Sequence, residues 1–545
     1  MTFSLSPCSE WPRIWPTLPV QASPWTAQEG DPHRWDPVLA ACQQTARARG
    51  IPQILSLSRS FSGLDPLVVL AQSLGSNSGS GLADSSYCYL AHTARYGSVR
   101  VLGLGALRRV YLLGEGRFQA SRAFLQELQP HVHTEAVDWG SRASTPASGQ
   151  EQERPLCFSR FSFNPERTYG PAALLVLPEW QIWQEQGPRS SVVAPVSKGS
   201  RTVARLNLEV RPESDLAVLG TRIHHFFAHM SRLSQHPLPR WELQTPLQVE
   251  VNREELLARI DRALQAIRAG SLEKVVLAEA VDLPLATPPP IPTVLAYLEQ
   301  RYADCSVFAF AEGIGSREAW ALDTAAGQGQ PFSSPERVFL GASPERLLSV
   351  WQGQIQIDAL AGSIARGETV SQDQALAQQL LQSPKDRQEH QLVVQSVGEA
   401  LRQVGLKPHI PSQPRLLQLA NIQHLQTLIQ AEMPPDLHLF DLLARLHPTA
   451  AVGGYPKQAA VDWIEAAEPF DRSGYAAPLG WVDLQGNGEF VVAIRSALIR
   501  GDRARLYAGA GIVVDSRPEQ EVAEIQLKLQ SLAQALAIQS TLSVC

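Results

Sequence analysis

The sequence contains few cysteines and no long apolar run. Only 6 of its 545 residues are cysteines, and they are scattered, with no CxxC pair. This pattern disfavours a thiolate zinc site and a disulfide framework, and it favours a reducing compartment. No stretch of about 18 apolar residues could span a bilayer, and the first residues lack the basic and apolar regions of a secretory signal. We therefore expect a cytoplasmic protein that does not associate with a membrane.

The chain also lacks a large excess of charge. Charged residues make up 18% of it, and the formal net charge is -6. This balance provides no basic surface for nucleic acid or for an anionic membrane, so neither is expected as a partner. Hydrophobic residues make up 44%, which is typical of a folded globular protein. The length allows one large domain or two to four ordinary ones.

The first half of the chain shows short apolar runs but no grouping of catalytic residue types. Runs at 99–105 and 172–177 predict strands, and the periodicity of 214–233 predicts a helix. No paired carboxylates and no nucleophile beside a base occur here. We therefore interpret residues 1–245 as scaffold and residues 246–540 as the catalytic region. Glycine, serine and proline content predicts loops at 75–81, 140–153 and 234–239.

The second half has a clearer order of helices and strands. Residues 254–269 place apolar side chains on one helical face, and Gly270 is positioned to end that helix. An apolar strand begins at Lys274. Residues 479–514 predict a meander of antiparallel strands joined by glycine-containing turns, and Pro518 opens a final helix. The chain is therefore expected to be a mixed α/β (α+β) protein with large antiparallel sheets.

Two predicted helices carry carboxylates that could bind a metal ion. Glu521, Glu524 and Lys528 project from one face of the last helix. Glu389 lies in an earlier helix that Ser383 is positioned to cap. On spacing alone, Glu524 and Lys528 would form an exposed ion pair worth only tenths of a kcal/mol. Alternatively, carboxylates from the two helices converge on a hard cation such as Mg²⁺, which needs few protein oxygens. Both interpretations remain open at this point.

Two basic residues lie in apolar strands. Arg495 belongs to the predicted strand 489–499, where a guanidinium needs an internal carboxylate or a bound anion as a partner. Lys274 stands at a strand end, where it could be solvated. If it is instead buried, it becomes a candidate general base. The sequence does not decide between these environments for Lys274.

The tetrapeptide Ser-Pro-Glu-Arg occurs twice within a short distance. The copy at 334–337 ends a Gly/Ala/Gln-rich segment, 324–333, which is interpreted as an insertion loop. The copy at 343–346 follows an apolar strand. Only the second copy is placed on a rigid element that can hold a catalytic acid, Glu345, in a fixed geometry.

Ten short motifs follow one another along the second half of the chain: LEKVVLA (272–278), FLGASPERLL (339–348), LAGS (360–363), SPKDRQEHQLVV (383–394), LANIQHL (419–425), LHPTAAVGG (446–454), YAAPLGWVD (475–483), AIRSA (493–497), YAGAGIV (507–513) and PEQEVAEIQLKL (518–529). In this order they resemble the chorismate-binding enzymes, a family of isochorismate, salicylate, anthranilate and aminodeoxychorismate synthases. Segments 101–106 and 171–180 extend the resemblance into the first half. The resemblance implies a single domain of two large antiparallel sheets surrounded by helices, and it argues against a domain boundary at 234–239.

Individual positions indicate the branch of the family. Ala361 stands where the aminodeoxychorismate branch has a nucleophilic lysine, so no covalent intermediate is expected. Residues 391–396 differ from the corresponding anthranilate synthase stretch, so water is expected as the nucleophile and no glutaminase subunit as a partner. Ala451 favours isochorismate synthase, because the salicylate branch has threonine there. The remaining alternatives are a salicylate synthase and a non-catalytic chorismate-binding subunit.

The resemblance implies a role for each candidate residue. Lys274 would be the general base that activates water, and Glu345 the general acid that protonates the departing hydroxyl of chorismate. Glu389 and Glu524 would bind Mg²⁺, with Glu521 as a helper. The substrate-binding residues would be Ala361, Gly362, Ser363, His447, Ala451, Tyr475, Arg495, Gly509, Gly511 and Lys528.

Some positions depart from the family pattern. Glu279 replaces a frequent arginine, and Ser363 replaces threonine but keeps a hydroxyl. The segment 324–333 lengthens the interval between the base and the acid. Residues 101–106 favour a quinone pathway, that of menaquinone or phylloquinone, over a siderophore pathway as the destination of the product.

Overall fold

The computed structural model describes most of the chain, and most of the predicted helices and strands within the described residues are found in it. Several predicted loops lie wholly or partly outside the described residues. The parts outside are 76–81, 140–153, 237–239 and 324–333, together with residues 334–336 of the first Ser-Pro-Glu-Arg copy. The residues described are 35–75, 86–92, 99–136, 154–166, 170–185, 201–236, 241–243, 247–312, 337–419 and 422–540.

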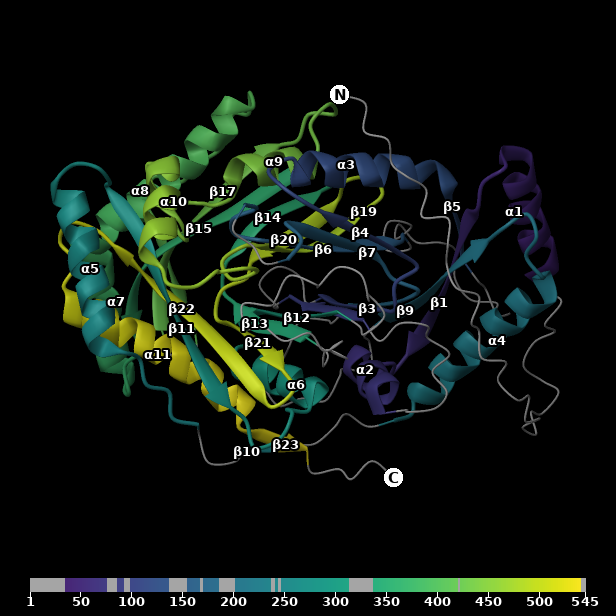
Figure 1. Ribbon diagram of the computed structural model, residues 1–545, viewed down its shortest axis with the longest axis horizontal. Helices are drawn as coiled ribbons and strands as arrows, with labels where there is room; N and C mark the ends of the chain where they lie inside the picture. Colours follow the sequence, from purple (N-terminus) through teal and green to yellow (C-terminus); the bar gives the residue numbers. More distant parts are fainter. Residues whose placement is uncertain are drawn as a thin grey trace, which may run out of the picture.

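Two large sheets form the body of the molecule (Figure 1). Within the described residues the first sheet has twelve strands, in the order β18 (Gly454–Tyr455), β11 (Lys274–Pro284), β22 (Arg503–Ile512), β21 (Ser496–Arg500), β13 (Arg337–Ser343), β12 (Ser306–Glu312), β2 (Tyr87–Ala91), β3 (Val99–Leu104), β8 (Trp180–Glu185), β9 (Arg201–Val210), β1 (Gln53–Ser62) and β5 (Val132–Ala136). The second has nine, in the order β16 (Arg415–Gln418), β17 (Ile422–Glu432), β15 (Gln354–Ala365), β14 (Arg346–Trp351), β20 (Gly488–Val492), β19 (Pro478–Asp483), β6 (Leu156–Phe161), β7 (Ala173–Leu177) and β4 (Arg108–Leu112).

Both sheets contain strands from before and after residue 245, so the two parts of the chain share one core. The expected α+β fold of two sheets in a single domain is confirmed. Every neighbouring pair of strands described in the two sheets is antiparallel except β1 and β5, which run parallel. An apolar cluster joins the inner faces of the sheets. In it, Trp183 of β8 and Trp481 of β19 meet edge to face with ring centroids 5.4 Å apart.

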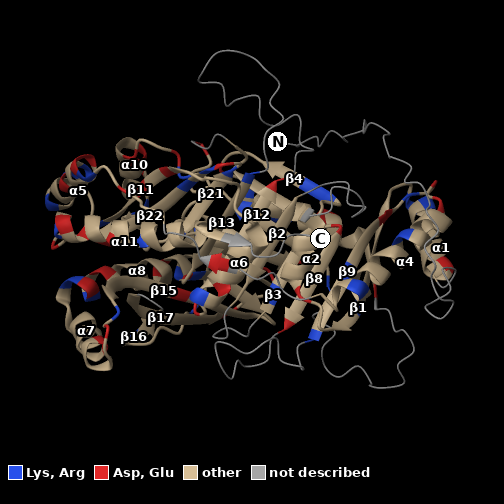
Figure 2. Ribbon diagram, turned by 90° about the horizontal axis from the view of Figure 1, so that it is seen from below, with Lys and Arg blue, Asp and Glu red and all other residues tan. Residues whose placement is uncertain are grey.

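Helices surround the sheets. They are α1 (Asp36–Arg49), α2 (Pro66–Gly75), α3 (Arg117–Leu128), the 3₁₀ turn η3 (Gln129–His131), α4 (Leu216–Leu233), α5 (Arg253–Arg268), α6 (Ile291–Arg301), α7 (Val370–Gln382), α8 (Pro384–Gln403), α9 (Leu439–Leu446), α10 (Lys457–Ala467) and α11 (Pro518–Leu536). A two-stranded ribbon pairs β10 (Trp241–Leu243) with β23 (Ile538–Ser540). The helices α5, α7, α8 and α11 gather at one end of the molecule, opposite α1 (Figure 1 and Figure 2).

The predicted helix ends are confirmed by their hydrogen bonds. The Ser383 side chain accepts from the Asp386 N–H, and Pro384 occupies the first turn of α8. At the end of α5, Gly270 adopts a φ of 77°, and its N–H donates to the Ile267 carbonyl. This is the glycine-terminated ending that the sequence predicted.

The predicted meander at 479–514 is wrong in one respect. β19 and β20 belong to the nine-stranded sheet, whereas β21 and β22 belong to the twelve-stranded sheet. The expected strand 489–499 is therefore two strands, and the chain crosses between the sheets at 493–495. Arg495 adopts a φ of 50° at this crossing. A run of apolar residues does not reveal such a break, because both strands are buried in the same core.

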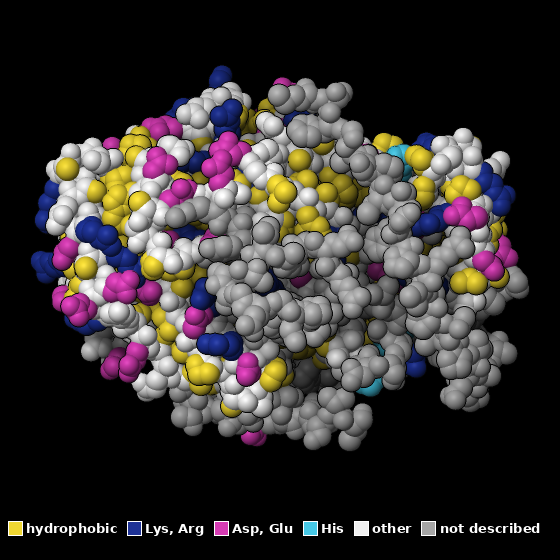
Figure 3. Space-filling model, viewed as in Figure 1, with side chains coloured by type: hydrophobic (Ala, Val, Ile, Leu, Met, Phe, Trp, Pro, Cys, Tyr) yellow, Lys and Arg dark blue, Asp and Glu magenta, His cyan; other side chains and the backbone are white. Residues whose placement is uncertain are grey.

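One face of the molecule shows charges of both signs. On the face shown in Figure 3, acidic and basic side chains of the described residues are mixed rather than gathered by sign. No helix among the described residues is both long enough and apolar enough to cross a bilayer.

Candidate active site

Lys274 is the first residue of β11 and is fully buried. Its side chain is 0% exposed, and its Nζ lies 3.1 Å from Glu389 Oε1. The strand runs between β18 and β22, so the apolar residues that follow Lys274 pack into the core. The solvated alternative for this lysine is therefore excluded. A buried ammonium with one carboxylate partner is a candidate for proton transfer.

Glu345 lies between β13 and β14, at the turn of the second Ser-Pro-Glu-Arg tetrapeptide. Its backbone N–H donates to Ser343 Oγ of β13 (3.2 Å), and its carbonyl accepts from the Val492 N–H of β20 (3.1 Å), so strands of both sheets hold it. Burial raises the pKa of Glu345 to about 8, although the positive charge of Lys274 lowers it. At pH 7 the carboxyl group is therefore mostly protonated and can act as an acid.

Three carboxylates of α8 and α11 each pair with a lysine. Glu389 pairs with Lys274 as described, Lys385 Nζ lies 2.6 Å from Glu521 Oε1, and Lys528 Nζ lies 2.7 Å from Glu524 Oε1. The predicted ion pair of Glu524 and Lys528 thus exists, but its side chains are only 23% and 17% exposed. Lys528 also donates to the Gly509 carbonyl at 2.8 Å. The pair is therefore half-buried and connected to β22, and it is not the exposed surface pair of the first interpretation.

The carboxylates of these two helices lie close enough to influence one another. Burial raises the pKa of Glu521, with Lys385 lowering it and Glu524 raising it. Burial also raises the pKa of Asp386, and Glu389 and Glu524 add to that effect. These carboxylates, two from each helix, therefore lie together with their lysine partners in one region of the structure.

This region fits a hard divalent cation by the chemistry of its donors. Within the described residues, no group of three or more His, Cys, Asp or Glu side chains is arranged as a ready metal cage. Magnesium is usually held by one or two carboxylates together with waters and substrate oxygens, so it does not require such a cage. Glu389 and Glu524 supply oxygens of the required kind from two different helices.

Glycines provide the space around these charged groups. A Cβ atom on Gly511 would lie 2.1 Å from Glu389 Oε1 and 3.0 Å from Lys274 Cε. A Cβ on Gly509 would lie 3.0 Å from the Tyr475 hydroxyl. Both glycines belong to β22, which pairs with the strand of Lys274. A side chain at either position would fill space next to the candidate base or next to Tyr475.

Arg495, His424 and Ser363 form a continuous hydrogen-bonded chain. Arg495 Nη2 lies 2.9 Å from His424 Nε2, and His424 Nδ1 lies 2.9 Å from Ser363 Oγ. Because a guanidinium can only donate, Nε2 accepts, and Nδ1 carries the proton that is donated to Ser363. Burial lowers the pKa of His424 well below its ordinary value, and Arg495 lowers it further, which is consistent with a neutral ring.

His424 is a site residue that sequence reasoning did not single out. It belongs to the LANIQHL motif of residues 419–425, so the imidazole in that motif was the available signal. Its partner Arg495 was predicted to need a carboxylate or a bound anion. The described partner is instead a neutral imidazole, so the positive charge of Arg495 is not neutralised by it.

The remaining predicted residues lie in different surroundings. Tyr475 is buried and stacks on Tyr507, with ring centroids 5.3 Å apart. Ala361 is buried in β15 and is followed by Gly362, whose φ is 72°. Ala451 is half-buried after α9.

His447 belongs to an aromatic cluster. Its ring meets Phe118 and Phe163, and its Nε2 lies 3.0 Å from the Phe163 carbonyl oxygen. Burial lowers the pKa of His447 well below its ordinary value. Among the described residues, none of these contacts involves another candidate residue. The sequence-based role of His447 in binding therefore stays a prediction.

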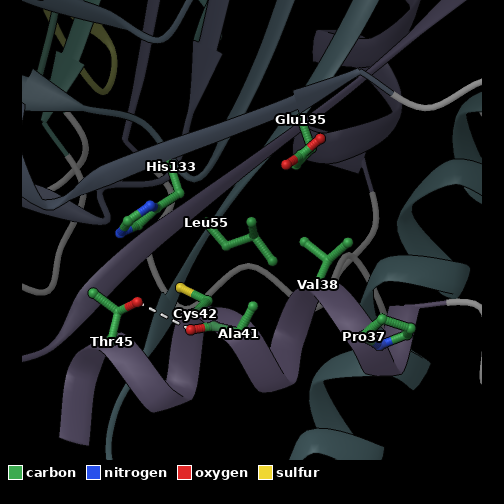
Figure 4. A pocket seen from close by; sticks show the side chains of 8 residues that line it. All are labelled: Pro37, Val38, Ala41, Cys42, Thr45, Leu55, His133 and Glu135. Atoms are coloured by element: carbon green, nitrogen blue, oxygen red, sulfur yellow. Dashed lines mark hydrogen bonds between the residues drawn. The ribbon is translucent and has the colours of Figure 1, made fainter. Parts of the chain in front are cut away.

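A separate cavity of about 290 Å³ lies at the far end of the molecule. It opens between α1 and strands β1 and β5, and Cys42, Leu55 and His133 are among its lining residues (Figure 4). None of the residues predicted from the motifs lines this cavity. This cavity beside α1 and the candidate catalytic groups therefore lie in different parts of the fold.

Comparison with known proteins identifies the class. The chain belongs to the family described as chorismate binding enzyme, whose model matches residues 40–316 and 331–537. The match extends over both sheets, including the part of the chain before residue 245.

Individual relatives of the chain include isochorismate synthases. The chain is 42% identical over 285 residues to the "Salicylate biosynthesis isochorismate synthase" of Pseudomonas aeruginosa, a match covering 52% of this chain and 55% of that protein. It is 34% identical over 337 residues to isochorismate synthase MenF of Escherichia coli, covering 62% and 72%. The solved structure of MenF, "the Menaquinone-Specific Isochorismate Synthase from Escherichia Coli", superposes with a TM-score of 0.65 at 26% identity, covering 92% and 99%. The chain thus spans about half the length of the Pseudomonas relative.

Proposed function

We propose that this protein is an isochorismate synthase that converts chorismate to isochorismate. The observation that carries the proposal is the placement of two buried groups with opposite tasks. Lys274 is fully buried next to one carboxylate, and Glu345 has a pKa raised to about 8 by burial. The two groups are also electrostatically coupled, since the positive charge of Lys274 lowers the pKa of Glu345. Such a pair supplies a base and an acid in one site.

Lys274 and Glu345 account for the two proton transfers of the reaction. The Lys274 ammonium that pairs with Glu389 would first release its proton to solvent. The neutral amine would then take a proton from a water molecule while the water oxygen forms a bond to C2 of the ring. The two ring double bonds shift, and the C4–O bond breaks. Glu345 would give its proton to the departing hydroxyl, which leaves as water. One water enters and one leaves, so the reaction is an isomerisation without oxidation or reduction. Each proton transfer contributes on the order of 10²–10⁴-fold when the geometry is held.

The carboxylates of α8 and α11 suggest the binding of Mg²⁺. Glu389 and Glu524 would hold the ion, and Glu521 would assist from α11. When bound, the ion would supply positive charge that orients and polarises the ring carboxylate of the substrate. Tyr475 and Arg495 would bind the enolpyruvyl carboxylate, which is supported by the charge of Arg495 having only a neutral imidazole as its described partner.

Two alanines favour isochorismate as the product over the products of the aminodeoxychorismate and salicylate branches of the family. Ala361 cannot act as a nucleophile, so a covalent intermediate on this position is excluded. Ala451 provides no hydroxyl next to the site. We further propose that the product enters a quinone pathway, in support of which the menaquinone-specific enzyme of E. coli covers 92% of this chain.

The test is an assay of the purified protein with chorismate and Mg²⁺, with the products separated by chromatography. The expected product is isochorismate without pyruvate. Salicylate together with pyruvate would identify a salicylate synthase instead. Saturable binding of chorismate without any product would identify a non-catalytic binding protein.

A further inference from the structure

β11, the strand that begins at Lys274, has a neighbouring strand on one of its two sides for only its first two residues. β18 has two residues, and it pairs only with Lys274 and Val275. The Val276 N–H still donates to the Gly453 carbonyl at 2.8 Å. Beyond this point, the backbone groups of β11 that face away from β22 need other partners, because unpaired buried backbone groups are costly.

The side chains of Glu468 and Arg472 supply those partners. Glu468 Oε1 accepts from the Ala278 N–H at 2.8 Å, and Arg472 Nη2 donates to the Val276 carbonyl at 2.7 Å. Arg472 Nε donates to Glu468 Oε2 at 2.8 Å, and Nη2 donates to Oε1 at 2.5 Å. Two side chains thus continue the hydrogen-bond ladder that β18 begins.

Arg472 also binds two other parts of the candidate site. Its Nη1 donates to the carbonyl of Val452 at 2.8 Å, next to Ala451. Its backbone carbonyl accepts from the Tyr475 N–H at 2.8 Å, and its guanidinium lies 5.9 Å from the centre of the Tyr475 ring. One arginine therefore connects the strand of Lys274, the segment of Ala451 and the residue Tyr475.

The pair is almost completely removed from water. The side chains of Arg472 and Glu468 are 3% and 2% exposed. A buried ion pair is a poor way to gain stability, because desolvation offsets much of the attraction. Its value here is geometric: the planar guanidinium donates in several fixed directions at once, which neither lysine nor an apolar side chain can do.

We propose that Glu468 and Arg472 are positioning residues that fix Lys274 relative to Tyr475 and the Ala451 segment. The proposal rests on the proposed function only in that Lys274 is taken as the general base. Neither residue is assigned a contact with substrate. A displacement of about 1 Å at a reacting group can cost on the order of 10²-fold in rate, so loosening this pair is expected to slow turnover without removing any reacting group.

The test compares two buried arginines that both donate to backbone carbonyls of β11. Arg472→Lys keeps a positive charge, but one ammonium cannot reach Glu468, Val276 and Val452 together. Arg259→Lys is the matched control: Arg259 is also buried, pairs with Glu279 of β11, and donates to the Ala278 carbonyl at 3.4 Å. Melting temperature, kcat and KM are measured for both variants.

The expected result separates positioning from stability. Both variants should melt at lower temperature by similar amounts. Arg472→Lys should lower kcat at least tenfold with a smaller change in KM, whereas Arg259→Lys should keep kcat within threefold. In a Lys274→Ala background, Arg472→Lys should cause little further loss of the residual rate. Equal kcat values for the two arginine variants, or losses that simply multiply in the Lys274→Ala background, would overturn the proposal.

A second variant and a second measurement allow the positioning role to be tested even if Arg472→Lys does not fold. Glu468→Gln retains an oxygen for the Ala278 N–H but loses the charge, and it takes the place of Arg472→Lys if that variant does not fold. Amide hydrogen exchange of residues 272–280 should be faster in the Arg472 or Glu468 variant than in Arg259→Lys. This readout does not depend on turnover. An inactive wild-type protein would contradict the proposed function, whereas equal exchange in the variants would contradict the positioning role.

Discussion

Two buried charge clusters in this molecule use similar residues in different ways. In the first, which we call the Arg100 cluster, Arg100 donates to Asp65 (2.8 Å), to Glu299 and to Gln184 (3.3 Å), and the Tyr89 hydroxyl also donates to Glu299. In the second, Lys274 has one carboxylate partner, Glu389, at 3.1 Å.

The clusters differ in the number of hydrogen-bond and ion-pair partners of the basic side chain at their centre. In the Arg100 cluster the guanidinium already has three side-chain acceptors from separate elements, which leaves little capacity for a ligand. Among the described residues, the Lys274 ammonium makes no hydrogen bond within standard geometry beyond its ion pair. An incompletely satisfied buried charge costs stability, so its retention indicates function. The first cluster therefore connects elements of the fold, and the second is available for a substrate.

The largest expected effect is at Lys274. Replacing it with alanine should lower kcat by about 10²–10⁴-fold, because the base is removed, while chorismate binding measured by calorimetry stays close to that of the wild type. Lys407→Ala is the control, because Lys407 is an exposed lysine after α8 that belongs to none of the motifs. It should keep kcat. Normal turnover of the Lys274 variant would show that the base is another group.

The Arg100 cluster should respond in the opposite way. Arg100→Leu removes one partner and leaves Asp65 and Glu299 buried without a counter-charge, which is expected to cost about 3–5 kcal/mol in the free energy of unfolding. The kcat of the folded fraction should not change. Denaturant unfolding and the specific activity at low denaturant are the measurements. A large loss of kcat at unchanged stability would mean that the two clusters do not differ as stated.

The metal prediction concerns Glu389, which belongs to the second cluster. Turnover should stop when divalent cations are removed with EDTA and should return with Mg²⁺. Glu389→Gln should raise the Mg²⁺ concentration for half-maximal rate by at least about tenfold, because a carboxylate ligand is lost. Glu399→Gln, on the same helix but paired with Gln395, is the matched control. An unchanged Mg²⁺ requirement in the Glu389 variant would remove it from the metal site.

The smallest predicted effect is a dependence on pH. The pKa of Glu345 is raised to about 8, so its acid form is present below pH 8 and is lost as the pH rises through that value. If it is the general acid, kcat/KM should fall about tenfold between pH 7 and pH 9. The profile is measured with chorismate quantified at each pH. A flat profile through pH 9 would mean that the departing hydroxyl receives its proton from a different donor.

Local structure was largely predictable from the sequence. The cap at Ser383, the helix ending at Gly270 and the strand beginning at Lys274 each depend on a few neighbouring residues, and all three are found. The crossing at 493–495 was not predicted, because two buried strands in succession have the same apolar pattern as one long strand. Which sheet each strand joins depends on partners far away in the chain.

The sequence indicated which side chains belong to the candidate site, but it did not indicate how buried they are or which groups they contact. Glu524 and Lys528 were expected to form an exposed pair or a part of a metal site. The structure shows the pair formed and mostly buried, with Lys528 donating to Gly509. His424 was missed because its importance comes from contacts with residues 61 and 71 positions away. The spacing of residues along the chain carries no information about such contacts.

The sequence by itself determined the helices, most strands and the set of motifs that indicated the family, because these depend on short-range patterns and on residue identity. Only the tertiary structure decided that Lys274 is fully buried, that burial raises the pKa of Glu345, and that Arg472 connects three parts of the molecule. The physical reason is the same in each case. Burial and hydrogen bonding between distant segments set the charge state and the position of a side chain, and neither exists until the two sheets have packed.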